Sequence, residues 1–172
     1  QVSEPYDIRG WTRFTFPGRN GKYSDFVWGF QHFTAVDYDD LHHEDGIFRI
    51  LGENKDFSSN VDGEMGNFDY LMFADIDYRN EEVIGEVLKW GEWLINTLGL
   101  DGMRMDALKH VNSTFMNVFV RAMRLRTGRN LYCAGEYWHR DPHALGTYLA
   151  ETEGQMALFD VARHFHFHEA SL

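Results

Sequence analysis

Apolar residues follow different patterns in the two parts of this chain. Residues 1–80 carry short aromatic or β-branched runs separated by turn formers such as Asp45-Gly46, with little helical periodicity. This pattern predicts a loop-rich segment with short strands. From Glu81 onward, apolar residues recur at intervals of three and four, as in helices that bury one face. The second part is therefore expected to contain regular helices.

The second part alternates helices with strands. The expected elements are a helix from Glu81 to near Gly99, a strand at about 102–106, a helix from Asn112 to Gly128, a strand at 131–137, a helix from Asp141, and a strand at about 156–160. Strands joined by helices through short connections run parallel, with right-handed crossovers. The sequence therefore predicts an α/β fold.

An acidic residue stands at the carboxyl end of each predicted strand: Asp106, Glu136 and Asp160. This end of the strands carries the chemistry in parallel α/β folds. Side chains alternate along a strand, so Arg104 and Asp106 share one face, and the guanidinium should lower the pKa of Asp106 and keep it ionised. An Arg–Asp pair at a strand end can equally be a structural ion pair.

Asp106 and Glu136 are one strand–helix–strand step apart, so both should face the same mouth. The apolar and aromatic run around Glu136 should raise its pKa and keep it protonated. Two carboxyl groups with opposite tuning can act as nucleophile and acid in a retaining glycosidase. Tyr137 and Trp138 offer flat faces for a sugar ring, although core packing is the commoner role of an aromatic residue.

Composition narrows the classes of partner. The net charge of −11 makes a phosphate backbone a poor partner, so we expect no nucleic-acid binding. No stretch approaches 18 apolar residues, so we expect no membrane span. The single Cys133 excludes an internal disulfide. A start at Gln1 instead of Met suggests a piece of a longer chain.

Several segments resemble the α-amylase family, glycoside hydrolase family 13. Asp101–His110 is similar to the segment that carries the family's nucleophile, and Ala134–Trp138 to the one that carries its general acid. Further stretches resemble the liquefying type of bacterial α-amylase: Gly10–Arg19, Gly66–Met72 and Leu158–Ser171. The resemblance covers nearly the whole chain in order.

The resemblance implies part of a (β/α)₈ TIM barrel. Residues 1–78 would be a loop-rich, calcium-binding insertion after the third strand, and residues 79–172 would hold about strands four to six. It also implies a third catalytic Asp beyond Leu172 and an early Asn before Gln1. The chain is then a central fragment, inactive alone, because three strands cannot close a barrel.

The same resemblance implies endo-hydrolysis of α-1,4-glucosidic bonds in starch-type glucans by a retaining mechanism. The roles it implies are nucleophile for Asp106, acid/base for Glu136, support for Arg104, and substrate binding for Lys109 and His110, with Tyr137 and Trp138 beside them. We expect a glucan as partner and a monomer at full length. The compartment, cytoplasmic or extracellular, is not determined.

For metals, the resemblance implies Ca²⁺ held by Asp69, Asp75 and the main-chain oxygen of His110, with the early Asn as a further ligand. Some relatives hold a second metal cluster beside this ion. We expect none here, because other residue types stand where acids would be needed: Thr34, Ser58 and Arg79.

Two alternatives stay open. One is a non-catalytic, calcium-stabilised relative that binds glucan. The other is a metal-dependent hydrolase that uses a histidine cluster, since three histidines would share one face of a strand: His164, His166 and His168. In the α-amylase family, however, this stretch is not a metal site.

Overall fold

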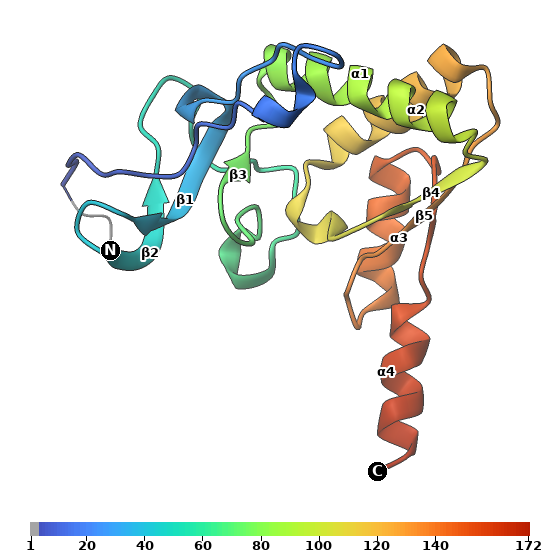
Figure 1. The fold of residues 1–172 in the computed structure, drawn as a ribbon. Coiled ribbons are helices and arrows are strands. Elements are labelled where there is room, and N and C mark those ends of the chain that lie inside the picture. The colour runs from blue at the N-terminus through green and yellow to red at the C-terminus, as the bar shows by residue number, and fades with distance from the viewer. Residues whose placement is uncertain (1–3) are drawn as a thin grey trace. The chain divides into compact units, whose positions relative to one another are not determined.

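The computed structural model describes residues 4–172, which form two compact units (Figure 1). The first unit comprises residues up to Phe57 together with Tyr70–Val83, and the second comprises Ser58–Asp69 and Ile84–Leu172. The domain boundary predicted near residue 78 stays a prediction. The compact units differ from it in two respects, because Ser58–Asp69 belongs to the second unit and residues 79–83 belong to the first.

The first unit is built on a small antiparallel sheet. Its strands are β1 (Phe33–Asp39), β2 (Glu44–Arg49) and β3 (Asp75–Ile76), in the order β2-β1-β3. Two short 3-10 helices precede them, at Pro17–Arg19 and Phe30–His32. The rest is loop and turn, as the sequence predicted. The central strand β1 carries the core of this unit, with Phe33, Ala35 and Val36 buried.

The second unit has a parallel sheet. Its strands are β4 (Gly102–Met105), β5 (Tyr132–Gly135) and β6 (Ala157–Leu158), in the order β4-β5-β6. Its helices are α1 (Glu81–Leu98), whose first three residues are counted with the first unit, α2 (Ser113–Thr127), α3 (Pro142–Glu151) and α4 (Val161–Ala170), with short 3-10 helices at Glu64–Gly66 and Leu108–His110. The α/β prediction, with parallel strands joined by helices after a loop-rich β part, is confirmed.

Both ends of α2 and the start of α3 lie where the local sequence signals predicted them. The Asn112 side chain caps α2 by accepting the Phe115 N–H at 2.9 Å, and Gly128 ends it with a φ of 66°. Asp141 caps α3, and Pro142 takes its first position. The predictions succeed here because caps act within one turn of the chain.

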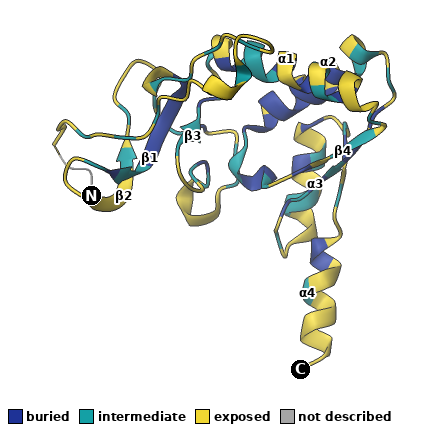
Figure 2. Cartoon of the chain, in the orientation of Figure 1, coloured by how far each residue is buried: buried dark blue, intermediate teal, exposed yellow. Residues whose placement is uncertain are grey.

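The core of the second unit lies beneath α1 and α2. Ile95 of α1 and Val120 and Met123 of α2 are fully buried. Gly91 lets the two helices approach, since an added Cβ would lie 2.7 Å from the Met123 sulfur. Figure 2 shows α4, in contrast, as largely exposed. No helix within residues 4–172 has both the length and the apolar character needed to cross a membrane.

One predicted arrangement is wrong. The three histidines would share a face only on a strand, whereas they lie in α4. On a helix, His164 and His168 are one turn apart, and His166 points elsewhere. The helix forms because Asp160 caps it, accepting the Arg163 N–H at 3.1 Å. Asp160 therefore has a structural role in α4.

Candidate active site

Two carboxyl groups lie side by side at the carboxyl ends of β4 and β5. Met105 pairs with Gly135 in register, and the Glu136 N–H donates to the Met105 carbonyl at 2.8 Å. Asp106 and Glu136 therefore leave neighbouring strands at the same level. The structure brings this pair together, as the sequence predicted.

Arg104 joins the two carboxylates. One guanidinium nitrogen donates to the Asp106 carboxylate, and the other lies 3.1 Å from Oε2 of Glu136. Hydrogen bonding from Arg104, and next from the Glu136 carboxyl, holds the pKa of Asp106 below its usual range, although a small loss of hydration acts the other way. The direction of this shift agrees with the predicted ionised state of Asp106, which stays a prediction.

The setting of Glu136 is aromatic, as predicted, but more polar than the sequence indicated. Its Oε2 accepts the Ala107 N–H at 3.2 Å as well as Arg104, and its Oε1 accepts the Trp138 indole N–H at 2.5 Å. The error has a geometric cause. The apolar neighbours Cys133 and Gly135 are buried on the other face of the strand, so sequence proximity overstates their contact with Glu136.

Lys109 and His110 contact the segment Ser58–Asp69 in the same unit. The buried Lys109 ammonium pairs with the Glu64 carboxylate and lies 4.9 Å from the centre of the Phe68 ring. Nδ1 of His110 lies 2.6 Å from the Phe68 carbonyl oxygen. Substrate contacts of these two residues stay predictions.

The two aromatic residues after Glu136 differ in exposure. Tyr137 is 6% exposed, its hydroxyl donates to the Asp62 carboxylate, and its ring lies 4.7 Å from the ring of Tyr148. The prediction that Tyr137 offers a face to a sugar is therefore wrong, because packing covers the ring. Trp138 is 46% exposed and meets His164 edge to face, with ring centres 5.5 Å apart.

Comparison with known proteins shows the family of this chain. No family model matches the chain. The α-amylase of Geobacillus stearothermophilus is 42% identical over 171 residues, or 99% of this chain. The α-amylase of Bacillus licheniformis is 42% identical over 170 residues, and the cytoplasmic α-amylase of Escherichia coli 39% over 170. The chain belongs to the α-amylase family.

This α-amylase-family chain spans about a third of the length of these relatives, since it covers 31%, 33% and 34% of them. Among solved structures, the α-amylase of Geobacillus thermoleovorans complexed with acarbose has a TM-score of 0.46 at 23% identity, covering 52% of this chain and 19% of that one. An Anoxybacillus α-amylase has a TM-score of 0.44 at 28% identity, covering 46% and 18%.

The residues predicted to bind calcium fall in both units of this family member. Asp69 is buried in the second unit, where it accepts the Ser58 N–H at 2.7 Å. Asp75 is in the first unit and accepts the Thr34 hydroxyl. Carboxylate oxygens are the donors that Ca²⁺ prefers, so the donor chemistry fits. The calcium site stays a prediction.

A metal site built from three or more side chains is absent from the part of the chain that the structure describes. Within residues 4–172, no three His, Cys, Asp or Glu side chains gather as a metal site. The predicted calcium set has only two such side chains and one main-chain oxygen, so this finding does not test it. The histidines of α4 form no such group either.

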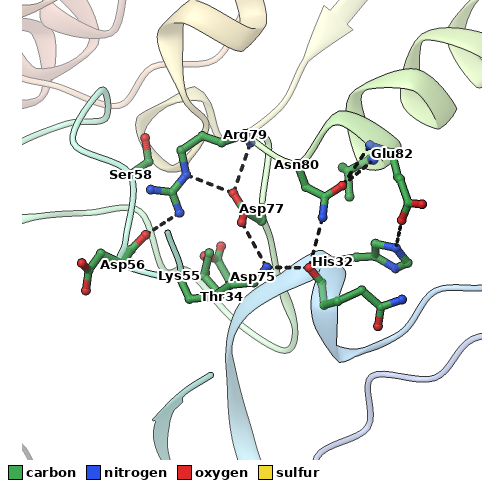
Figure 3. Close-up of polar contacts among 12 residues, drawn as sticks. His32, Thr34, Lys55, Asp56, Ser58, Asp75, Asp77, Arg79, Asn80 and Glu82 are labelled. Atoms are coloured by element: carbon green, nitrogen blue, oxygen red, sulfur yellow. Dashed lines mark hydrogen bonds and ion pairs between the residues drawn. The ribbon is translucent and has the colours of Figure 1, made fainter. Parts of the chain in front are cut away.

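One charged group in the first unit was not predicted from the sequence. The Asp77 carboxylate, 6% exposed, lies 3.1 Å from the Lys55 ammonium and 3.0 Å from Nε of Arg79 (Figure 3). We call these three residues the Asp77 clamp. Lys55 also donates to the Gln31 carbonyl at 2.5 Å, and Arg79 to the Asp56 carbonyl at 2.5 Å.

The Asp77 clamp joins segments that are far apart in sequence. Burial acts to raise the pKa of Asp77, but hydrogen bonds from Arg79 and Lys55 outweigh it and lower the pKa. Arg79 is thus held in an ion pair within the first unit. A partner 22 residues away, such as Lys55 for Asp77, carries no local sequence signal.

Proposed function

We propose that the protein carrying this chain is an endo-acting hydrolase of α-1,4-glucosidic bonds in starch-type glucans. The observation that carries the proposal is the pair of carboxyl groups, Asp106 and Glu136, joined by Arg104 at neighbouring strand ends. The names of the relatives, α-amylases, support the same reaction class. We further infer that β4, β5 and β6 are consecutive strands of a (β/α)₈ barrel.

In the proposed mechanism, Asp106 is the nucleophile. Its carboxylate attacks the anomeric carbon while Glu136 gives its proton to the glycosidic oxygen, so the bond to the leaving sugar breaks as the bond to Asp106 forms. The Glu136 carboxylate then takes a proton from water, which attacks the same carbon and frees Asp106. Two inversions retain the configuration of the sugar.

The electrostatics of the site support this division of roles. A lowered pKa keeps Asp106 ionised, as a nucleophile requires. Arg104 holds both carboxyl groups, and its charge offsets the repulsion that arises when both are ionised. Arg104 therefore orients the pair throughout the reaction.

We also propose that Asp69, Asp75 and the main-chain oxygen of His110 hold a Ca²⁺ ion. His110 closes the 3-10 helix that follows Asp106 by two residues. The ion would supply fixed positive charge near this turn. It takes part in no step of the proposed hydrolysis.

The test is starch hydrolysis by the full-length protein and by Asp106→Asn and Glu136→Gln variants. We expect each variant to lose at least about a thousandfold in kcat. Asp101→Asn is a matched control, because Asp101 is an exposed acid at the opposite end of β4. A near-normal rate in either active-site variant would contradict the proposal.

A second measurement concerns the 172-residue chain alone. It spans about a third of its relatives, so we expect no turnover of starch from it. If the full-length protein bound maltooligosaccharide in calorimetry but hydrolysed none, the non-catalytic alternative would be favoured. Robust turnover by the short chain would contradict the expectation that it is inactive alone.

A further inference from the structure

The Glu136 carboxyl group is held by a neutral donor on each of its two oxygens. The Trp138 indole N–H donates to Oε1 at 2.5 Å, and the Ala107 main-chain N–H donates to Oε2 at 3.2 Å. A carboxyl group that accepts a hydrogen bond at each oxygen cannot rotate freely about its Cγ–Cδ bond. Its orientation is therefore fixed relative to Asp106, which immediately precedes Ala107.

The Ala107 donor depends on an uncommon backbone conformation. Ala107 has a φ of 51°, in the left-handed region that residues other than glycine seldom adopt. The turn that follows carries the Leu108 N–H to the Glu136 carbonyl at 3.0 Å, so the two segments are joined by main-chain and side-chain contacts. Strained conformations of this kind persist where surrounding contacts over-determine them.

Trp138 reaches the carboxyl group from the same strand end. Side chains two residues apart on an extended chain share a face, so the indole lies beside Glu136. Edge contacts with His164 and Phe165, at 5.5 and 6.2 Å between ring centres, orient the ring. An indole nitrogen can only donate, so this contact does not depend on a choice of tautomer.

We propose that Trp138 is a positioning residue for proton transfer by Glu136, with the Ala107 N–H as its main-chain counterpart. This inference rests on the proposed function. Donors to a carboxylate favour its charged form, so the indole stabilises the carboxylate that forms when Glu136 gives its proton to the glycosidic oxygen. The proton balance of Glu136 is unchanged over one turnover, because its proton moves to the leaving oxygen and is replaced by one from water.

A role as a sugar platform makes different predictions. A platform acts through its ring face, so Trp138→Phe would keep most of the effect, and any loss would fall on KM. A positioning residue acts through its N–H, which Phe lacks. The loss would then fall on kcat and only on bonds whose leaving group needs a proton.

The experiment compares Trp138→Phe with the unaltered full-length protein on two substrates. One is a maltooligosaccharide, whose alkoxide leaving group needs protonation; the other carries a nitrophenyl leaving group that departs without it. We expect kcat on the first to fall about tenfold or more with little change in KM, and kcat on the second to fall less than about twofold.

A control variant separates this effect from general loss of a tryptophan. Trp93→Phe in α1 removes an indole of similar exposure, 45% against 46%, and should behave as the unaltered protein on both substrates. Melting temperatures check folding. Equal losses on both substrates, or a rise in KM alone, would overturn the positioning role.

The proposed function is tested separately. Glu136→Gln should show the same selectivity between substrates with larger losses, and Asp106→Asn should lose activity on both. If Asp106→Asn kept its activity, the proposed function would fail. If both of those variants behaved as expected and Trp138→Phe matched Trp93→Phe, only the role of Trp138 would fall.

Discussion

Removal of the Lys55 ammonium tests whether the Asp77 clamp holds the first unit together. The perturbation is Lys55→Met, which keeps an unbranched side chain of similar length and removes the charge. It abolishes the ion pair with Asp77 at 3.1 Å and the hydrogen bond to the Gln31 carbonyl at 2.5 Å. Arg79 still neutralises the carboxylate, so the loss is partial.

The expected magnitude follows from burial and from the partners that remain. A hydrogen bond to a charged group contributes about 1.5–3 kcal/mol, so Lys55→Met or Arg79→Met should each cost roughly 2 kcal/mol. The double variant should cost more than the sum by about 1 kcal/mol or more, because it leaves the buried Asp77 carboxylate without any cation. The excess over additivity is the signature of the clamp.

Amide hydrogen exchange across residues 75–83 provides a local assay. The Asp77 N–H donates to the His32 carbonyl at 3.0 Å, and the Asn80 N–H to the Asp77 carbonyl at 3.0 Å, so both report opening of this region. Urea unfolding of the same variants gives the global value. Both assays should rank the variants in the same order of stability loss.

The matched control is Arg49→Met. Arg49 pairs with Asp56, but the two side chains are 41% and 86% exposed, so the loss should stay below about 0.5 kcal/mol. If Lys55→Met and Arg79→Met cost no more than this control and added without excess, the clamp would be an ordinary surface ion pair. The argument from burial would then be refuted.

Three further predictions concern other parts of the chain. A chelator should lower the melting temperature of the full-length protein if the proposed calcium site is present, because an ion bound only by the native state stabilises it by mass action; an unchanged value would argue against the site. Gly102→Ala should destabilise by about 2 kcal/mol or more in urea unfolding, because the new Cβ would lie 2.3 Å from the Tyr132 carbonyl oxygen, whereas Gly85→Ala, with open space around it, should be neutral or stabilising. The pKa of Asp62 is lowered in the folded protein, because the hydrogen bond from the Tyr137 hydroxyl and other contacts outweigh the effect of burial. Ionised Asp62 therefore stabilises the fold fully above the unfolded pKa near 3.9, and this contribution is lost as pH falls through the folded pKa. Tyr137→Phe should reduce the loss of stability in acid, measured by unfolding at several pH values, and an unchanged acid dependence would count against the reasoning.

The sequence alone determined helices α1 to α3, strands β4 to β6 and the placing of the paired acids. Helical periodicity from Glu81, a cap at Asn112 and a stop at Gly128 act over a few residues, so they are readable without a fold. Strand alternation likewise placed Arg104 beside Asp106, and the spacing of one strand–helix–strand step placed Glu136 next to them. These features depend on local geometry and on the regularity of parallel sheets.

Only the tertiary structure decided what surrounds those residues. The donors on Glu136, the burial of Tyr137 against Tyr148 and Asp62, and the pairing of Lys55 with Asp77 join groups that are brought together by folding. The local sequence cannot specify such contacts, because burial and charge pairing depend on which distant segments meet. The pattern of residues thus located the carboxyl pair, and packing determined which groups hold it and tune it.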